Sequence, residues 1–139
     1  MQTPEENNPQ KILIVDDDVD ILLMLTMILK EYGFVVEGTL NGTEAFARAS
    51  RFHPDLIIMD IFLSGTNGKD ICKKIKSSEI TKDIPVFLIS SEHQPEAISE
   101  YGADEFIDKP FDINYLLTKV KDYLPIPNAD KLKLNEKIK

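Results

Sequence analysis

Short, continuously apolar runs alternate along this chain with longer stretches in which apolar residues recur at helical spacing. Runs of this kind fill residues 12–15, 56–59 and 86–89. A strand that is apolar on both faces is typical of a parallel sheet covered by helices on both sides. The alternation therefore favours an α/β architecture, and it constrains the fold more strictly than the composition does.

The complete pattern predicts five strands and five helices. The expected strands lie at residues 12–15, 34–36, 56–59, 86–89 and around 106–107. The expected helices lie at residues 21–29 with Gly33 as the C-terminal cap, from Asn41 to Ala49, from Gly68 to Lys76, at 94–100 and at 113–124. Because strands and helices alternate, we expect a doubly wound parallel sheet.

Both ends of the chain differ from this pattern. Residues 1–9 are polar, acidic and contain proline, so we predict a disordered lead-in rather than a signal peptide. Residues 125–139 carry four Lys against Asp130 and Glu136. We interpret this Lys-rich stretch as a solvated tail or a short terminal helix. The single domain is expected at residues 10–124.

Charge and hydropathy limit the possible partners. The net charge is −8, whereas proteins that bind nucleic acid directly normally present a basic patch to the phosphates. No apolar run approaches the ~20 residues that a membrane-spanning helix needs. The lone Cys72 lies on one face of an expected helix and is interpreted as a buried structural thiol. We therefore expect a cytoplasmic protein that binds neither nucleic acid directly nor membranes.

Polar side chains lie at the carboxyl ends of four expected strands. Asp16 and Asp17 follow the first strand, Asp60 the third, Ser90 the fourth and Lys109 the fifth. In a doubly wound sheet, ligands bind beyond the carboxyl ends of the strands. These five side chains are therefore predicted to converge on one crevice.

The convergence of three carboxylates has a chemical consequence. Neighbouring carboxylates repel one another unless a cation compensates, and oxygen ligands suit a hard ion such as Mg²⁺. Lys109 and the Ser90 hydroxyl, together with the metal, would neutralise an anion at Asp60. A phosphoryl group on the Asp60 carboxylate fits this description, because aspartate is an established nucleophile in phosphoryl transfer.

Four motifs, ILIVDDD, LIIMD, PVFLISS and DKPF, occur in this order within about residues 10–124. Over this range the chain resembles the receiver domain of two-component response regulators, in particular the single-domain, chemotaxis-regulator-like members. The resemblance implies a flavodoxin-like sheet of order 2-1-3-4-5. It also implies that Asp60 accepts a phosphoryl group from a phosphohistidine of a sensor histidine kinase or a histidine phosphotransfer protein. A chain of this kind would catalyse only its own phosphorylation and dephosphorylation.

The same resemblance assigns the metal ligands. Asp16, Asp17, Asp60 and the main-chain carbonyl of Phe62 would hold Mg²⁺. Two residues in the loop that follows Asp60 are notable. Ser64 stands where the family usually has Pro, so we expect a more mobile loop, and the bulky side chain of Phe62 is expected to shade the phosphoryl group from water.

The resemblance also implies a switch. Ser90 would donate a hydrogen bond to a phosphoryl oxygen, and Lys109 would pair with the phosphoryl charge. Phe106 lies at the switch aromatic position and would turn inward when Ser90 is drawn to the phosphoryl group. The surface formed by the fourth helix, fifth strand and fifth helix would then change and bind a downstream protein target.

Other interpretations account for fewer of these residues. A hydrolase of the haloacid-dehalogenase type needs a second Asp two positions after the nucleophile, where this chain has Phe62. A flavodoxin-type cofactor carrier would not place three carboxylates near a phosphate. A degenerate receiver would not need the complete acidic, hydroxyl and lysine set. Asp18 is interpreted as a helix N-cap, and His53 and His93 as surface residues.

Whether the chain is a stand-alone receiver or a piece of a larger regulator stays open at this point, as do its kinase and its output.

Overall fold

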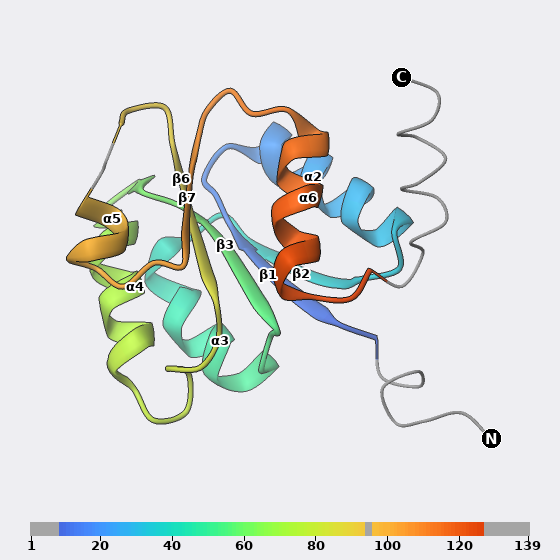
Figure 1. Cartoon of the computed structure of the whole chain (residues 1–139). Helices are drawn as coiled ribbons and strands as arrows, with labels where there is room; N and C mark the ends of the chain where they lie inside the picture. The colour runs from blue at the N-terminus through green and yellow to red at the C-terminus, as the bar shows by residue number, and fades with distance from the viewer. Residues whose placement is uncertain (1–8, 94–95, 127–139) are drawn as a thin grey trace.

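A computed structural model describes residues 9–93 and 96–126 of the chain. Five parallel strands form one sheet in the order β2-β1-β3-β6-β7 (Figure 1). These strands are β1 (Lys11–Val15), β2 (Val35–Thr39), β3 (Leu56–Asp60), β6 (Val86–Ser90) and β7 (Glu105–Asp108). In chain order of the five strands this is 2-1-3-4-5, so the predicted flavodoxin-like topology is confirmed.

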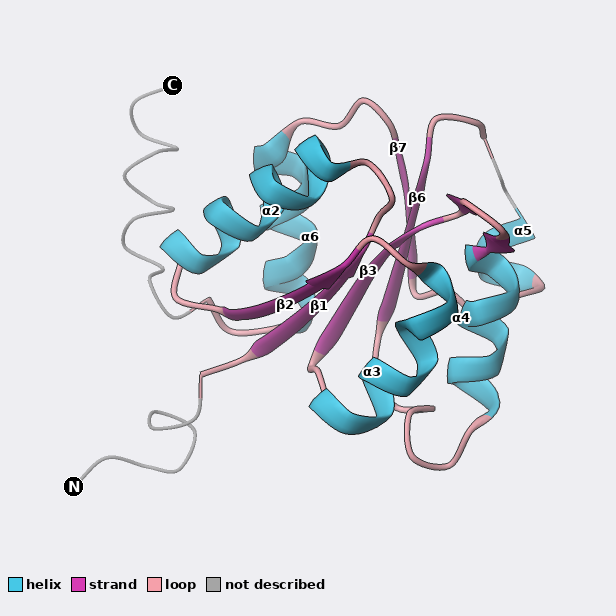
Figure 2. Cartoon of the chain, turned by 180° about the vertical axis from the view of Figure 1, so that it is seen from behind, coloured by secondary structure: helices cyan, strands magenta, loops and turns pink. Residues whose placement is uncertain are grey.

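Helices cover both faces of the sheet. They are α2 (Val19–Glu31), α3 (Ala45–Phe52), α4 (Gly68–Ser77), the short α5 (Glu96–Ser99) and α6 (Ile113–Tyr123). Figure 2 shows α2 and α6 on one side of the sheet, with α3 and α4 on the other. Each side has its own apolar core, because successive strand residues point to opposite faces. The prediction of a sheet wound on both faces is confirmed.

The three central strands are buried along their whole length, which explains their continuous apolar sequences. All residues of β3 and β6 are buried, and β1 is buried from Ile12 onward. Ile12 and Ile14 pack with α2 and α6, whereas Leu13 and Val15 pack with α3 and α4. The edge strand β2 is mostly half-buried, so its sequence carries a weaker apolar signal.

Sequence patterning placed several boundaries incorrectly. The second strand was expected to end at residue 36, but β2 continues to Thr39, where it pairs with Val15. Glu37 and Gly38 lack an apolar pattern, yet their main chains complete the parallel ladder. The helix expected from Asn41 begins as a 3-10 turn, η1 (Gly42–Glu44), before α3.

A two-stranded antiparallel hairpin, β4 (Phe62–Leu63) with β5 (Thr66–Asn67), was also not predicted. Of the short helix expected at residues 94–100, the structure has Glu96–Ser99 as α5. The lead-in expected at residues 1–9 and the tail expected at 125–139 lie mainly outside the described residues, and the boundaries of the domain stay a prediction.

Local side chains fix both ends of α2, the helix that follows the acidic cluster. Asp18 is the N-cap, as predicted, and its carboxylate accepts hydrogen bonds from the main-chain nitrogens of Asp20 and Ile21 at 2.9 and 3.3 Å. Gly33 follows the C-terminal cap with a positive φ of 97°, a conformation that glycine adopts without strain. The carboxylate of Asp18 therefore serves to cap the helix.

Cys72 lies in α4 with its side chain fully buried, as predicted. Burial raises the pKa of its thiol to about 12. The thiol is therefore protonated and unreactive at neutral pH. Among the described helices, none combines the length and the apolar character that crossing a membrane requires.

Candidate functional site

The carboxyl ends of four strands place the predicted side chains at one edge of the sheet. Asp16 directly follows β1, Asp60 ends β3, Ser90 ends β6 and Lys109 directly follows β7. Because β1, β3, β6 and β7 are neighbours in the parallel sheet (Figure 1), their carboxyl ends bring these residues to the same edge. Lys109 is tied to the neighbouring strand by a hydrogen bond from its main-chain nitrogen to the Ser90 carbonyl, 2.8 Å long.

Asp16, Asp17 and Asp60 form a compact cluster of carboxylates. Each residue contributes one oxygen, and these oxygens all lie within 4.8 Å of one another. Asp16 is fully buried and Asp60 is only 7% exposed, whereas Asp17 is exposed. The cluster is thus open to solvent on the side of Asp17 and closed on the side of the core.

One lysine joins two of the three carboxylates. The Nζ of Lys109 donates hydrogen bonds to Oδ2 of Asp60 at 2.7 Å and to Oδ2 of Asp16 at 3.1 Å. Burial by itself lowers the pKa of Lys109, but its hydrogen bonds to Asp60 and Asp16 outweigh that effect, so its pKa is raised. Lys109 therefore stays positively charged at neutral pH.

Main-chain donors also hold the two inner carboxylates. Oδ1 of Asp16 accepts a hydrogen bond from the nitrogen of Asp18 at 2.9 Å, and Oδ1 of Asp60 accepts one from the nitrogen of Phe62 at 3.1 Å. Burial nevertheless raises the pKa of Asp16, and the hydrogen bonds from Asp18 and Lys109 offset only part of this rise. Ionised Asp16 thus lacks part of the stabilisation that water would give it.

The donor set fits Mg²⁺. The cluster contains three carboxylates, and Lys109 pairs with two of them, so the four groups together keep a net negative charge when all are ionised. Oxygen-only ligation by carboxylates, with one side open for water, is what Mg²⁺ prefers. The main-chain nitrogen of Phe62 donates to Asp60, and Phe62 pairs with Asn67 in the β4–β5 hairpin, while the contribution of its carbonyl to the metal site stays a prediction.

Ser90 and Phe106, the two residues of the predicted switch, lie on the neighbouring strands β6 and β7. Ser90 is fully buried, and its hydroxyl oxygen accepts a hydrogen bond from the main-chain nitrogen of Glu92 at 3.0 Å. Phe106 pairs with Leu88 on the neighbouring strand and is half-buried against the core on the α3 and α4 side. Its ring also contacts His93 edge-on, with centroids 6.1 Å apart.

Ser64 makes a contact that the sequence did not predict. Its main-chain nitrogen and its hydroxyl both donate hydrogen bonds to Oδ2 of Asp17, at 3.0 and 2.7 Å. The two residues are separated by 47 positions in the chain, so no local spacing signals the pair. Ser64 had been noted only for its expected effect on loop mobility, which stays a prediction.

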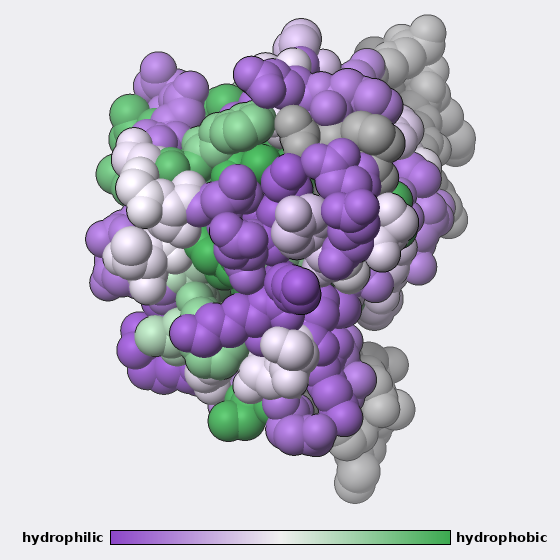
Figure 3. All heavy atoms as spheres, turned by 90° about the vertical axis from the view of Figure 1, so that its left-hand side faces the viewer, coloured by the Kyte–Doolittle hydropathy of each residue, from purple (hydrophilic) through white to green (hydrophobic). Residues whose placement is uncertain are grey.

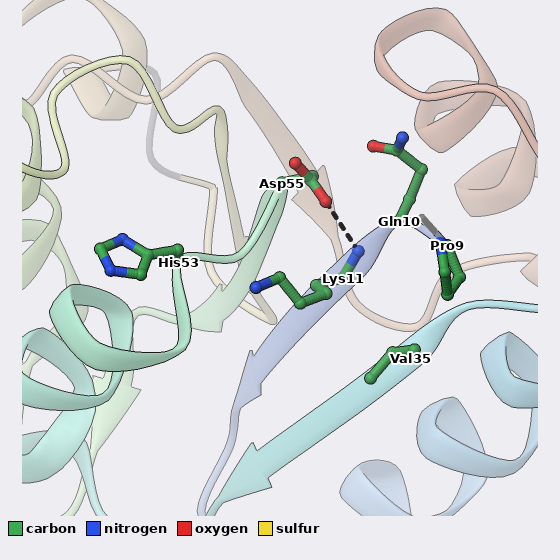
Figure 4. A pocket seen from close by; sticks show the side chains of 6 residues that line it. All are labelled: Pro9, Gln10, Lys11, Val35, His53 and Asp55. Carbon is green, nitrogen blue, oxygen red and sulfur yellow. Dashed lines mark hydrogen bonds between the residues drawn. The ribbon is translucent and has the colours of Figure 1, made fainter. Parts of the chain in front are cut away.

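The two histidines lie outside the carboxylate cluster, as predicted. His53 is exposed at the C-terminus of α3, beside a hollow at the amino ends of β1 and β3 (Figure 4). Figure 4 shows the carboxylate of Asp55 turned toward the main-chain nitrogen of Lys11, while the His53 ring points away from both. His93 is largely exposed and lies 3.8 Å from the carboxylate of Asp108.

The sheet order defines a flavodoxin-like α/β protein, and the carboxylate cluster at the carboxyl edge of its sheet is a candidate metal site. The sequence matches the response regulator receiver domain over residues 12–121, and the chain therefore belongs to this family.

Curated relatives are longer than this chain. The DNA-binding dual master transcriptional regulator RpaA of a Synechocystis species is 34% identical over 128 residues, which cover 87% of this chain and 53% of that protein. The response regulator ArlR of Staphylococcus aureus is 34% identical over 114 residues, covering 82% of this chain and 52% of that protein. The chain thus spans about half the length of the curated relatives it matches.

Solved structures match over nearly their whole length. The chemotaxis protein CheY4 of Vibrio cholerae has 29% identity and a TM-score of 0.78, covering 84% of this chain and all of that one. The response regulator TrrA of Thermotoga maritima, solved in complex with Mg²⁺ and BeF, has 32% identity and a TM-score of 0.75. That match covers 83% of this chain and 99% of the TrrA chain. These neighbours support the predicted resemblance to chemotaxis regulators.

Proposed function

We propose that this chain is the phosphoacceptor of a two-component phosphorelay and that Asp60 receives the phosphoryl group in a Mg²⁺-dependent reaction. The donor is a phosphohistidine of a sensor histidine kinase or a histidine phosphotransfer protein. The observation that carries the proposal is the 2.7 Å hydrogen bond between Lys109 and Asp60 within the carboxylate cluster. It places a fixed positive charge where the phosphoryl charge would arrive.

In this reaction an oxygen of the Asp60 carboxylate attacks phosphorus, and the bond between phosphorus and the imidazole nitrogen breaks. The electron pair of that bond stays on the imidazole. Asp16, Asp17, Asp60 and the carbonyl of Phe62 would hold Mg²⁺, which supplies charge neutralisation for the phosphoryl oxygens. Lys109 would follow the new charge from Asp60, because it already binds that carboxylate.

The side chain of Phe62 bears on how long a phosphoryl group would remain on Asp60. The side chain of Phe62 is 46% exposed, two positions after Asp60. An apolar ring at this position would hinder the approach of water to the phosphorus atom. We therefore propose that Phe62 slows the dephosphorylation of Asp60. We also propose that the chain catalyses only its own phosphorylation and dephosphorylation, as its resemblance to receiver domains implies.

The proposed output surface consists of α5, β7 and α6, and a downstream protein is its partner. Figure 3 shows the left-hand side of Figure 1, where α5 of this surface lies next to α4. This face presents small apolar patches among polar atoms. The names of several relatives include DNA binding, but the match to this chain covers only about half of each of those proteins. With its net charge of −8, this chain is proposed to act without direct contact to nucleic acid, in the cytoplasm.

The metal requirement can be tested with acetyl phosphate as the donor. Intact-mass measurement should show one added phosphoryl group on the wild-type chain with Mg²⁺ and none after chelation. The variant Asp17→Asn should bind Mg²⁺ more weakly by more than about tenfold, the loss typical of a residue that merely supports a metal ligand. Its labelling should be slower and its melting temperature without metal higher, because one crowded negative charge is removed.

Asp20→Asn provides the matched control, since Asp20 lies in the first turn of α2 and outside the cluster. Its Mg²⁺ affinity should equal that of the wild type. Labelling of the wild type that continues in the presence of a chelator would rule out the metal-dependent reaction. Equal Mg²⁺ affinities of Asp17→Asn and the wild type would remove Asp17 from the metal site.

The switch can be tested with beryllofluoride, which mimics a phosphoryl group on Asp60. Ser90 is the buried hydroxyl at the end of the neighbouring strand, and drawing it toward the new charge would vacate space for Phe106. Ser90→Ala should still be labelled at Asp60 but lose most of the NMR shift changes of Phe106, Ile107 and residues 113–124. The exposed neighbour Ser91 provides the control variant Ser91→Ala, which should respond like the wild type.

Shift changes of equal size in Ser90→Ala and the wild type would contradict the coupling between Ser90 and Phe106, even if phosphorylation itself proceeds.

A further inference from the structure

The three carboxylates of the cluster are held in different ways. Lys109 and the nitrogen of Asp18 bind Asp16, and Lys109 and the nitrogen of Phe62 bind Asp60. Asp17 has no hydrogen bond to this lysine. Its carboxylate instead accepts hydrogen bonds from the main-chain nitrogen and the hydroxyl of Ser64, 47 positions away in the sequence.

The hydrogen bonds from Ser64 restrain the direction in which the Asp17 side chain points. Asp17 is exposed and is repelled by two carboxylates nearby, so an unrestrained side chain would turn toward solvent. Two donors from Ser64 converge on one oxygen, Oδ2, at 3.0 and 2.7 Å. Hydrogen bonds to a charged acceptor are stronger than those between neutral groups, and here they oppose the repulsion. The other oxygen of Asp17 is left for a cation.

The resulting spacing is close to that of an assembled metal site. The ligand oxygens of Asp16, Asp17 and Asp60 lie within 4.8 Å of one another. In an octahedral Mg²⁺ site, with bonds of 2.0–2.1 Å, opposite ligands are about 4.2 Å apart. These oxygens therefore need only small movements to ligate Mg²⁺, provided that Asp17 stays where Ser64 holds it.

We propose that Ser64 is a positioning residue that holds Asp17 in place for Mg²⁺ and thereby raises the metal affinity of the site. The inference rests on the proposed function, because it concerns the same metal. The two hydrogen bonds from Ser64 go to Asp17 and not to Asp60, so Ser64 acts through Asp17. A proline at this position would lack both the hydroxyl and the N–H that donate to Asp17.

The test is the Mg²⁺ affinity of the metal-free chain, measured by isothermal titration calorimetry at constant ionic strength. Ser64→Ala removes the shorter of the two hydrogen bonds and should weaken Mg²⁺ binding about tenfold, at the lower end of the range for residues that orient metal ligands. Ser64→Thr keeps a hydroxyl and should restore most of the affinity. Ser77→Ala removes a hydrogen-bonded hydroxyl at the far end of α4 and should change nothing.

A double-mutant cycle separates positioning from a general effect on the fold. In the background of Asp17→Ala, the change Ser64→Ala should have no further effect on Mg²⁺ affinity, because its target is gone. Thermal unfolding without metal, followed by circular dichroism, establishes that each variant is folded.

The possible outcomes distinguish this inference from the proposed function. If the wild type binds Mg²⁺ but Ser64→Ala binds it equally well or more tightly, Ser64 does not position Asp17, and the metal site stands without it. An undiminished effect of Ser64→Ala in the Asp17→Ala background would likewise overturn the inference. If the wild type binds no Mg²⁺, the proposed metal-dependent function itself fails.

Discussion

Replacing Asp60 by Asn is expected to abolish phosphoryl labelling of this chain by acetyl phosphate and Mg²⁺. The amide of Asn has no anionic oxygen, so it is a poor nucleophile for phosphorus. Among the described residues, the carboxylates that pair with Lys109 are those of Asp16 and Asp60, and only Asp60 keeps any exposed surface, 7% against 0% for Asp16. Intact-mass measurement should therefore show one phosphoryl group on the wild type and none on Asp60→Asn.

The matched control is Asp108→Asn, which makes the same chemical change at an exposed residue one position before Lys109. This variant should be labelled like the wild type. Asp60→Asn should remain folded, since Lys109 keeps its ion pair with Asp16 at 3.1 Å, and circular dichroism can verify this. Stoichiometric labelling of folded Asp60→Asn would refute the assignment of the phosphoacceptor.

Replacing Gly68 by Ala should destabilise the fold more than an ordinary surface substitution. A Cβ at Gly68 would collide with the main-chain carbonyl of Asp60 and approach the Cα of Ile61 to 2.9 Å. These atoms belong to the backbone, which cannot rotate away as a flexible side chain can. We expect the free energy of unfolding to fall by about 1–3 kcal/mol, the usual cost of overpacking. Urea denaturation followed by circular dichroism provides the measurement.

Because the displaced backbone carries Asp60, the proposed phosphoacceptor, Gly68→Ala should also slow its labelling. Gly38→Ala is the control, since its added Cβ would come within 2.7 Å of Cδ1 of Leu22, the end of a side chain that can change rotamer. Its effect on stability should be clearly smaller. Equal stabilities of Gly68→Ala and the wild type would show that the loop after β3 relaxes freely and does not constrain Asp60.

The sequence predicted the central strands correctly because strands that are buried on both faces consist of consecutive apolar residues. β3 and β6 are buried at every residue, so each appears as an uninterrupted apolar run. The edge strand β2 was cut short because Glu37, Gly38 and Thr39 pair through their main chains, which any residue type except proline can do. The hairpin β4–β5 was missed for a related reason, since two-residue strands are too short for periodicity to register.

The sequence by itself determined which residue types end the strands, and hence that carboxylates, a hydroxyl and a lysine meet at one edge of a parallel sheet. Only the tertiary structure decided how these groups are paired. Lys109 binds Asp60 across 49 positions of the chain, and Ser64 binds Asp17 across 47. The approach of Gly68 to the backbone of Asp60 is equally invisible in the sequence. Such contacts depend on how strands and loops are placed in space, whereas patterning along the chain records only which side of each element is buried.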